Sequence, residues 1–266
     1  MNAIEQKKAL ATAVTAARAA GKIMRANLRE AKKINEATRH DIKLELDVRC
    51  QKRIERELRR AFPKVPILGE EGILGDPEAP VRWVVDPIDG TVNFSYGIPH
   101  ACVSIALQTR GARRGARGDF ISTVGVVYDP FTDELWTAIR GQPARLNGQV
   151  VHVSRRRQLA EAIVALGFAK HETTLHRMLP TLNELIHQVR KIRIMGAAAL
   201  ALVYVGTGRM EAYIEYGLRL WDIAAGGLIV ECAGGRFQCL ALADDYTYEI
   251  LASNARLACA LEQFRH

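Results

Sequence analysis

The pattern of apolar and polar positions divides the chain into two halves of different type. The first half shows two helical patterns, then strand-like runs whose connections carry Gly or Asp-Pro, which is typical of an antiparallel meander. From about residue 155, strand-like and helical segments alternate, which favours an α/β arrangement. We therefore expect an N-terminal α+β domain, residues 1–154, packed against a C-terminal α/β domain, residues 155–266.

Individual elements follow from the same pattern. The first helix presents one apolar stripe, made of Leu10, Val14, Ala17, Gly21, Met24 and Leu28. A second helix has Cys50, Ile54 and Leu58 on one face and ends at Phe62-Pro63, and Asn147-Gly148 predicts a hairpin turn. Strands are expected at 67–68, 83–85, 101–109, 123–128, 134–139, 162–166, 192–195, 210–216 and from 250, and further helices at 175–189, 197–205, 221–232 and the C-terminus.

Charge and cysteine usage narrow the class of protein. The net charge of +8 could indicate a nucleic-acid partner, but much of the excess lies in Arg110–Arg117 and Arg155–Arg157, where no aromatic residue is interleaved. Solvated basic loops are the favoured interpretation, so nucleic acid is not expected as a partner. The five cysteines show no zinc-type spacing, which favours reduced thiols and a cytoplasmic location. The longest apolar run, residues 196–206, is too short to span a bilayer.

The segment from 83 to 94, WVVDPIDGTVNF, is the most informative part of the chain. A strand-like run delivers Asp86 and Asp89 into a turn built by Pro87 and Gly90, and Thr91 stands at a helix start. Two carboxylates beside helix-terminal amides suit a site that holds a divalent metal and a phosphate together. An ordinary Asp-Pro-x-Asp-Gly surface turn is the alternative, and this segment alone leaves both open.

Three further acidic features occur at the ends of expected elements. Each has a simple structural explanation: Glu70 and Glu71 could be loop residues, Asp222 an N-cap, and Asp47 an acid that compensates a helix dipole. The small residues at 224–227 could serve close helix packing. Acids at several strand and helix ends, where ligands can converge, favour a common site.

These segments resemble the signature blocks of the inositol monophosphatase family. The blocks are Gly69-Glu70-Glu71, then Val84 to Phe94, then Trp221-Asp222 with its small residues and Gly234-Gly235, and they occur in the family's order over roughly residues 5 to 260. The resemblance implies a layered α/β/α/β/α fold, a homodimer, and a magnesium-dependent, lithium-sensitive phosphatase.

The resemblance also implies a ligand set for two to three Mg²⁺ ions. Glu70, Asp86 and the backbone carbonyl of Ile88 would hold one ion, and Asp86, Asp89 and Asp222 would hold the second. Glu70 would also face a third, weaker ion and help to activate the attacking water. Oxygen ligands suit Mg²⁺, and the absence of a Cys/His set argues against zinc.

The remaining implied roles concern the water and the substrate. Thr91 would orient the water with support from Asp47, and the amides of Gly90 and Thr91 would hold the phosphate. Substrate contacts are implied for Asp89, Gly90, Thr91, Gly196, Ala197, Glu215 and Asp222. The chain departs from the family at Asp41–Asp47, where the usual Val-Thr is replaced, and Gly167–His171 bears little resemblance to the inositol-specific members.

The expected function is hydrolysis of a phosphate monoester, inositol monophosphate, by direct attack of a metal-bound water. Metal ions can neutralise the phosphate and supply the nucleophile, and no Ser-His or Cys-His arrangement is needed. A small phosphorylated polyol or sugar is therefore the expected substrate. The alternatives are a related phosphatase for fructose-1,6-bisphosphate, histidinol phosphate or adenosine 3′,5′-bisphosphate, and a nucleic-acid-associated relative that uses the basic loops.

Overall fold

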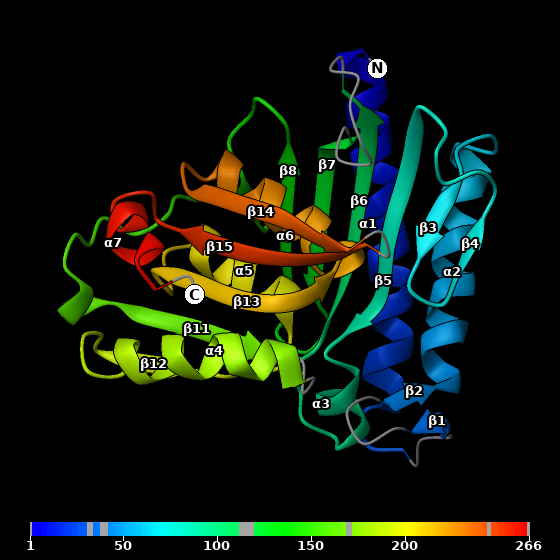
Figure 1. Cartoon of the computed structure of the whole chain (residues 1–266). Helices are drawn as coiled ribbons and strands as arrows, with labels where there is room; N and C mark the ends of the chain where they lie inside the picture. Colours follow the sequence, from blue (N-terminus) through cyan, green and yellow to red (C-terminus); the bar gives the residue numbers. More distant parts are fainter. Residues whose placement is uncertain are drawn as a thin grey trace.

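Two β-sheets with helices beside and between them form the described part of the chain, which is residues 2–30, 34–37, 42–111, 120–168, 172–243 and 246–264 of a computed structural model (Figure 1). The helices are α1 (Ala3–Asn27), α2 (Glu45–Ala61), α3 (Thr91–Ser95), α4 (Glu172–Leu185), α5 (Ala198–Gly206), α6 (Leu220–Cys232) and α7 (Ala258–Glu262). The strands are β1 (Ile34–Ala37), β2 (Ile42–Leu44), β3 (Ile67–Gly69), β4 (Gly72–Leu74), β5 (Val81–Asp89), β6 (Cys102–Arg110), β7 (Phe120–Asp129), β8 (Glu134–Ile139), β9 (Arg145–Leu146), β10 (Gln149–Val150), β11 (Ile163–Phe168), β12 (Lys191–Arg193), β13 (Ala212–Arg219), β14 (Arg236–Ala243) and β15 (Thr247–Ser253).

The first sheet has the strand order β10-β9-β8-β7-β6-β5-β3-β4. Its pairs are antiparallel except for β3 and β5, so the meander expected from the sequence is confirmed. Helix α1 packs on one face. Of the predicted stripe, Ala17, Gly21 and Met24 are buried and Leu10, Val14 and Leu28 are half-buried, whereas the rest of the buried face is formed by alanines that the stripe did not include: Ala9, Ala13, Ala16 and Ala20. A Cβ at Gly21 would lie 2.5 Å from the Tyr128 ring, so the small side chains of this stripe let the helix approach the sheet closely.

The second sheet has the order β12-β11-β13-β15-β14. Strand β11 pairs in parallel with β12 and β13, whereas β13, β15 and β14 pair antiparallel. The alternating strand and helix pattern anticipates the parallel part. It misses β14, an edge strand in which exposed Leu240 breaks the apolar pattern of a buried strand. It also misses β1, β2 and β4, which are too short to show a clear period.

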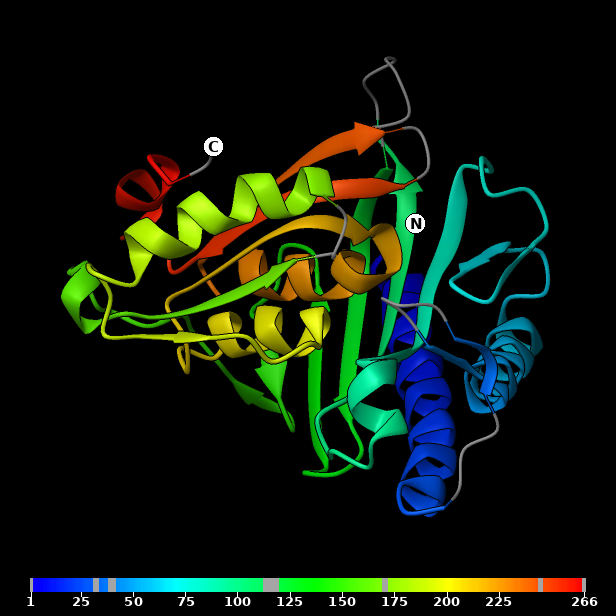
Figure 2. The same cartoon turned by 60° about the horizontal axis from the view of Figure 1, so that its bottom comes forward.

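Helices α5 and α6 lie between the two sheets (Figure 2). Ala199, Leu200 and Ala225 belong to the core against the first sheet, whereas Leu202 and Val230 belong to the core against the second. This middle layer is tightly packed: a Cβ at Gly226 would lie 2.7 Å from Leu202, and one at Gly125 would lie 2.9 Å from the Ala225 carbonyl oxygen. Close packing therefore explains the small residues that follow Asp222.

Helices α4 and α7 cover the outer face of the second sheet, where Met178 of α4 and Leu261 of α7 share a core with Ile214 of β13. With α1 and α2 on the outer face of the first sheet, the layers run α/β/α/β/α, as the family resemblance implies. Among the described residues no helix is long and apolar enough to cross a membrane. Asp41, most of the basic run 110–117 and residues 169–171 lie outside the described residues.

Candidate active site

Strand β5 brings two carboxylates to one cavity by means of an irregularity in its pairing. Asp86 lies opposite Ser104, and Asp89 lies opposite Cys102, so β5 has one more residue than β6 between these two pairs. In a regular strand, residues three apart point to opposite faces; the extra residue resets the alternation. Both carboxylates therefore line the same cavity. A bulge is also where a central strand tolerates proline, here Pro87.

Glu70 reaches the same place from the neighbouring parallel strand. Strand β3 ends at Gly69, opposite Val85 of β5, and the backbone N–H of Glu70 donates to the Val85 carbonyl at 3.1 Å. The carboxyl ends of parallel strands meet at one edge of a sheet, so Glu70 and Asp86 become neighbours. Their two carboxyl groups lie within hydrogen-bonding reach of each other.

Asp222 approaches from the second half of the chain, on the first turn of α6. Its Oδ2 accepts a hydrogen bond of 2.7 Å from the backbone N–H of Arg219. The capping role raised from the sequence is therefore present, although Asp222 occupies the third helical position and not the N-cap itself. The same carboxylate also lines the cavity with Glu70, Asp86 and Asp89.

Asp89 joins the two halves of the chain at the start of α5. Its Oδ1 accepts from the N–H of Ala198 at 3.0 Å, and its Oδ2 accepts from the N–H of Ala199 at 2.8 Å. The Cys102 thiol donates to Oδ2 at 3.5 Å. Burial raises the pKa of Asp89 to about 6 in spite of these hydrogen bonds, which favour the ionised form. Asp89 thus accepts hydrogen bonds from the first two backbone N–H groups of α5, which have no carbonyl partner within that helix.

The cavity has a volume of about 370 Å³. Every residue for which the sequence predicts a role lines it, except Asp47: the lining includes Glu70, Asp86, Ile88, Asp89, Gly90, Thr91, Gly196, Ala197, Glu215 and Asp222. None of the described lining residues is basic. The cavity is therefore a strongly acidic hollow between the two sheets.

The electrostatics of this cluster favour a bound cation. Burial raises the pKa values of Glu70, Asp86 and Asp222 well above the ordinary range, and repulsion among the acids of the cavity adds to the shift. Carboxylate oxygens are the ligands that Mg²⁺ prefers, so the residue types fit this ion. As the side chains stand, no three acidic, Cys or His side chains in the described residues already enclose a metal ion.

The turn between β5 and α3 has a defined backbone. Gly90 adopts φ 91°, and a Cβ there would lie 2.9 Å from the His100 carbonyl oxygen, so glycine is required. The Thr91 hydroxyl donates to the Ile88 carbonyl at 2.8 Å. This hydroxyl and this carbonyl, for which the resemblance implies roles toward water and metal, are therefore in direct contact at the cavity.

Comparison with known proteins agrees with this geometry. The model of the inositol monophosphatase family matches residues 5–264. The chain belongs to the inositol monophosphatase family. It is 37% identical over 97% of its length to Nus factor SuhB of Xylella fastidiosa, covering 94% of that protein, and 39% identical over 85% of its length to inositol monophosphatase 1 of Solanum lycopersicum, covering 82%. The crystal structure of suhB from Bartonella henselae has a TM-score of 0.86 at 33% identity, covering 95% of this chain and 96% of that one.

Asp47 is not among the residues that line the acidic cavity. It is buried at the start of α2, where its Oδ2 accepts a hydrogen bond of 2.6 Å from the Leu44 N–H. The helix-start role raised from the sequence is therefore present. Its charge contributes to the raised pKa of Glu70, so it lies close enough to act on the cavity electrostatically.

Sequence reasoning missed three residues that shape this inositol monophosphatase site. Cys102 contacts Asp89 from behind, and the Asn93 side chain donates to the Met195 carbonyl at 2.8 Å, which ties α3 to the turn before α5. A Cβ at Gly167 would lie 1.8 Å from Glu215 Oε2, so a larger residue here would displace the Glu215 carboxylate from its present place in the cavity. Each role depends on a contact between distant segments, and no local pattern announces it.

Proposed function

We propose that this protein is a Mg²⁺-dependent phosphate monoester hydrolase that acts on inositol monophosphate by direct attack of water. The family and the fold show a phosphatase in general terms. The observation that carries the finer proposal is the convergence of Glu70, Asp86, Asp89 and Asp222, from three separate elements, on one cavity that has no basic residue among its described lining.

The same side chains would hold the metal. Glu70, Asp86, Asp89 and Asp222, together with the Ile88 carbonyl, offer an oxygen-only ligand set. Bound Mg²⁺ would neutralise phosphate charge and acidify a water molecule. The Glu70 carboxylate would also help to activate the attacking water.

The hydroxyl of Thr91 would position the attacking water. Its donated bond to Ile88 directs the hydroxyl proton away, which leaves the Oγ1 lone pairs to accept a hydrogen bond. Such an acceptor holds a water molecule in one orientation, so that an oxygen lone pair faces the phosphorus atom. No side chain of this set needs to become covalently phosphorylated.

The substrate's hydroxyl groups would meet the wall of the cavity formed by the second half of the chain. Glu215 lines this wall and accepts a hydrogen bond from Tyr213, and burial raises its pKa to about 7. Gly196, with φ 71°, makes the turn into α5 that lines the cavity beside Ala197. A carboxylate and a small-residue turn suit a polyol, and the volume of about 370 Å³ suits a small phosphorylated ring.

A panel of phosphate esters assayed with Mg²⁺ tests this proposal. We expect the highest kcat/KM for inositol monophosphate, relative to fructose-1,6-bisphosphate, histidinol phosphate and adenosine 3′,5′-bisphosphate. A much higher kcat/KM for one of the other esters would reject the inositol assignment and keep the phosphatase. Lack of Mg²⁺-dependent hydrolysis of any ester would reject the phosphatase assignment for this chain.

A second candidate function is association with nucleic acid. A relative of 37% identity carries the name Nus factor SuhB, and this chain has a net charge of +8. Arg155 and Arg157 are exposed, as expected of the second basic run, whereas Arg156 pairs with buried Glu211 at 2.7 Å. An RNA mobility shift at physiological salt decides this question, because non-specific phosphate contacts weaken steeply with salt.

The protein is also proposed to be a cytoplasmic homodimer. Several large apolar side chains are exposed on the described surface: Tyr96, Ile98, Leu179, Ile186 and Ile194. Their burial between two copies would remove apolar surface from water. The five cysteines are free, which fits a reducing compartment. Light scattering on the purified protein measures the oligomeric state, and a monomer would reject the dimer.

A further inference from the structure

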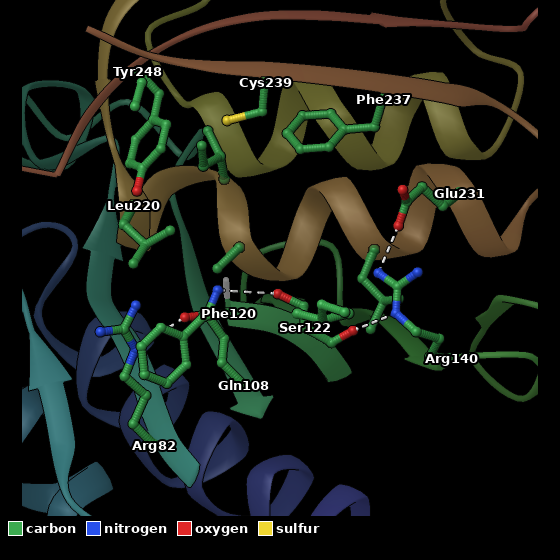
Figure 3. Close-up of a pocket in the computed structure, with 15 residues that line it drawn as sticks. Arg82, Gln108, Phe120, Ser122, Arg140, Leu220, Glu231, Phe237, Cys239 and Tyr248 are labelled. Carbon is green, nitrogen blue, oxygen red and sulfur yellow. Dashed lines mark hydrogen bonds and ion pairs between the residues drawn. The ribbon is translucent and has the colours of Figure 1, made fainter. Parts of the chain in front are cut away.

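A second cavity lies on another face of α6. It has a volume of about 420 Å³ and is formed by α6 together with β5, β6, β7, β14 and β15 (Figure 3). Leu220, Ile223 and Ala224 of α6 line it, a spacing that marks one face of a helix, whereas Asp222 lines the acidic cavity. The two cavities share none of their described lining residues.

Most of the wall of the second cavity is apolar. The rings of Phe120 from β7 and Phe237 from β14 contribute to it, together with Leu220 of α6 (Figure 3). Leu228 of α6 also lines it. A concave, mainly apolar surface with a few polar groups is the usual form of a small-molecule site, and this volume falls within the usual range.

One end of the second cavity holds a buried cation. Arg82 is 2% exposed; its Nε donates to Gln108 Oε1 at 3.0 Å, and its Nη1 donates to the Pro77 carbonyl at 2.9 Å. Its guanidinium lies 3.6 Å from the centroid of the Phe120 ring. The carboxylate of Glu78 is 3.7 Å away and about half exposed, so this pair contributes little compensation. Burial lowers the pKa of Arg82, and interactions with Tyr246, Glu78 and Tyr248 oppose that shift.

The other charged groups of the cavity do not cancel that charge. Arg140 donates to Glu231 at 2.7 Å, so the second arginine and the one acidic residue of the described lining neutralise each other. Tyr248 interacts electrostatically with Arg82, and Figure 3 shows its hydroxyl directed into the cavity toward Leu220. The cavity therefore combines an apolar body with one cationic, hydrogen-bonding end.

We propose that this second cavity is a binding site for a small organic anion with an aromatic body. The acidic group of the ligand lies toward Arg82 and Tyr248, and its aromatic body lies against Phe120, Phe237 and the apolar face of α6. This site is independent of the phosphatase assignment, because it uses none of the acidic-cavity residues.

Fluorescence titration with 8-anilino-1-naphthalenesulfonate, an aromatic anion, tests the proposal on the full chain. We expect saturable binding that persists with Mg²⁺ and inorganic phosphate present, and affinity at least about tenfold higher than for neutral N-phenyl-1-naphthylamine, because a desolvated charge pair adds to apolar burial. Displacement by Mg²⁺ and phosphate, equal affinity for both probes, or no saturable binding would each overturn it.

Two variants and a matched control locate the binding. Ala241 is exposed, lines the cavity and pairs with Tyr248 across β14 and β15, so Ala241→Phe should fill the site and weaken binding at least about tenfold. Tyr248→Phe should weaken binding about fivefold or more through loss of its hydroxyl. Ala26→Phe places the same side chain at another exposed cavity, beside Arg25, and should leave affinity unchanged. Wild-type affinity in Ala241→Phe, or equal losses in Ala26→Phe, would place the probe elsewhere.

Discussion

Substitution of Gly167 by alanine should separate polyol recognition from phosphate hydrolysis. Gly167 and Glu215 face each other on the parallel strands β11 and β13, and a Cβ at position 167 would lie 1.8 Å from Glu215 Oε2. A carbon–oxygen contact needs roughly 3.3 Å, so the carboxylate must move by about 1.5 Å. The hydrogen bond from Tyr213 to this carboxylate would be broken or distorted by that movement.

The expected result is a loss specific to the polyol substrate. A misplacement of about 1 Å can cost about 100-fold in rate, so kcat/KM for inositol monophosphate should fall by about that factor, mainly through KM. Hydrolysis of p-nitrophenyl phosphate, which has no polyol hydroxyls, should change by less than about twofold. Loss of the Tyr213 hydrogen bond should cost about 1–3 kcal/mol of unfolding free energy, offset by about 0.4–1 kcal/mol from the stiffer unfolded chain.

A double-mutant cycle with Glu215→Ala tests whether Glu215 carries the effect of Gly167→Ala. If the effect of Gly167→Ala passes through Glu215, then Gly167→Ala should cause no further loss of inositol monophosphate hydrolysis in the Glu215→Ala background. Additive losses, an equal loss for both substrates, or unchanged kinetics in Gly167→Ala would refute the proposed contact.

Three further predictions concern the acidic cavity. Asp89→Asn should reduce turnover at least about 1000-fold through loss of a metal ligand, and wild-type turnover would contradict this prediction. The same variant should destabilise the start of α5 by about 1–2 kcal/mol, because Asn offers one oxygen acceptor to the two amides of Ala198 and Ala199. The pKa values of Asp89 and Glu215 in the folded protein are raised to about 6 and about 7, so the protonated carboxyls favour the folded state. In EDTA, this contribution to the free energy of unfolding is therefore complete at a pH below their ordinary pKa values and is lost as the pH rises through 6 to 7. The melting temperature in EDTA should therefore fall from pH 5 to pH 8, and Mg²⁺ should raise it more at pH 8; a rise with pH in EDTA would be the opposite result. Because the chain belongs to this family, Li⁺ at roughly tens of millimolar should inhibit hydrolysis. A rate assay with K⁺ as the control salt measures this inhibition.

Local sequence signals predicted the elements that carry the acids. The strand run before Asp86, the Pro87 and Gly90 turn and the close of α6 by Gly234 all follow from residue types that restrict the backbone, and Gly234 has φ 86°. The carboxylates therefore appear at element ends, as expected. Whether they would face one another was not a local property. The family resemblance was the basis for expecting them to converge, and in the structure the bulge in β5 turns Asp86 and Asp89 to the same side.

The features of the fold and the site that could not be predicted from the sequence depend on tertiary contacts. Strand β14 takes its place by pairing with β15 at the edge of a sheet, where little apolar burial is required. The roles of Gly167 against Glu215 and of Asp89 in capping α5 join segments many residues apart. The second cavity likewise exists only because α6 lies between two sheets. Hydrophobic periodicity reports which face of an element is buried, not which element buries it.

Anomalous diffraction from crystals soaked with Mn²⁺, a substitute for Mg²⁺, tests the metal assignment most directly. We expect anomalous peaks within coordination distance of Glu70, Asp86, Asp89 and Asp222, and loss of a peak in Asp89→Asn. Peaks confined to other surfaces, with these carboxylates still held by protein hydrogen bonds, would contradict it.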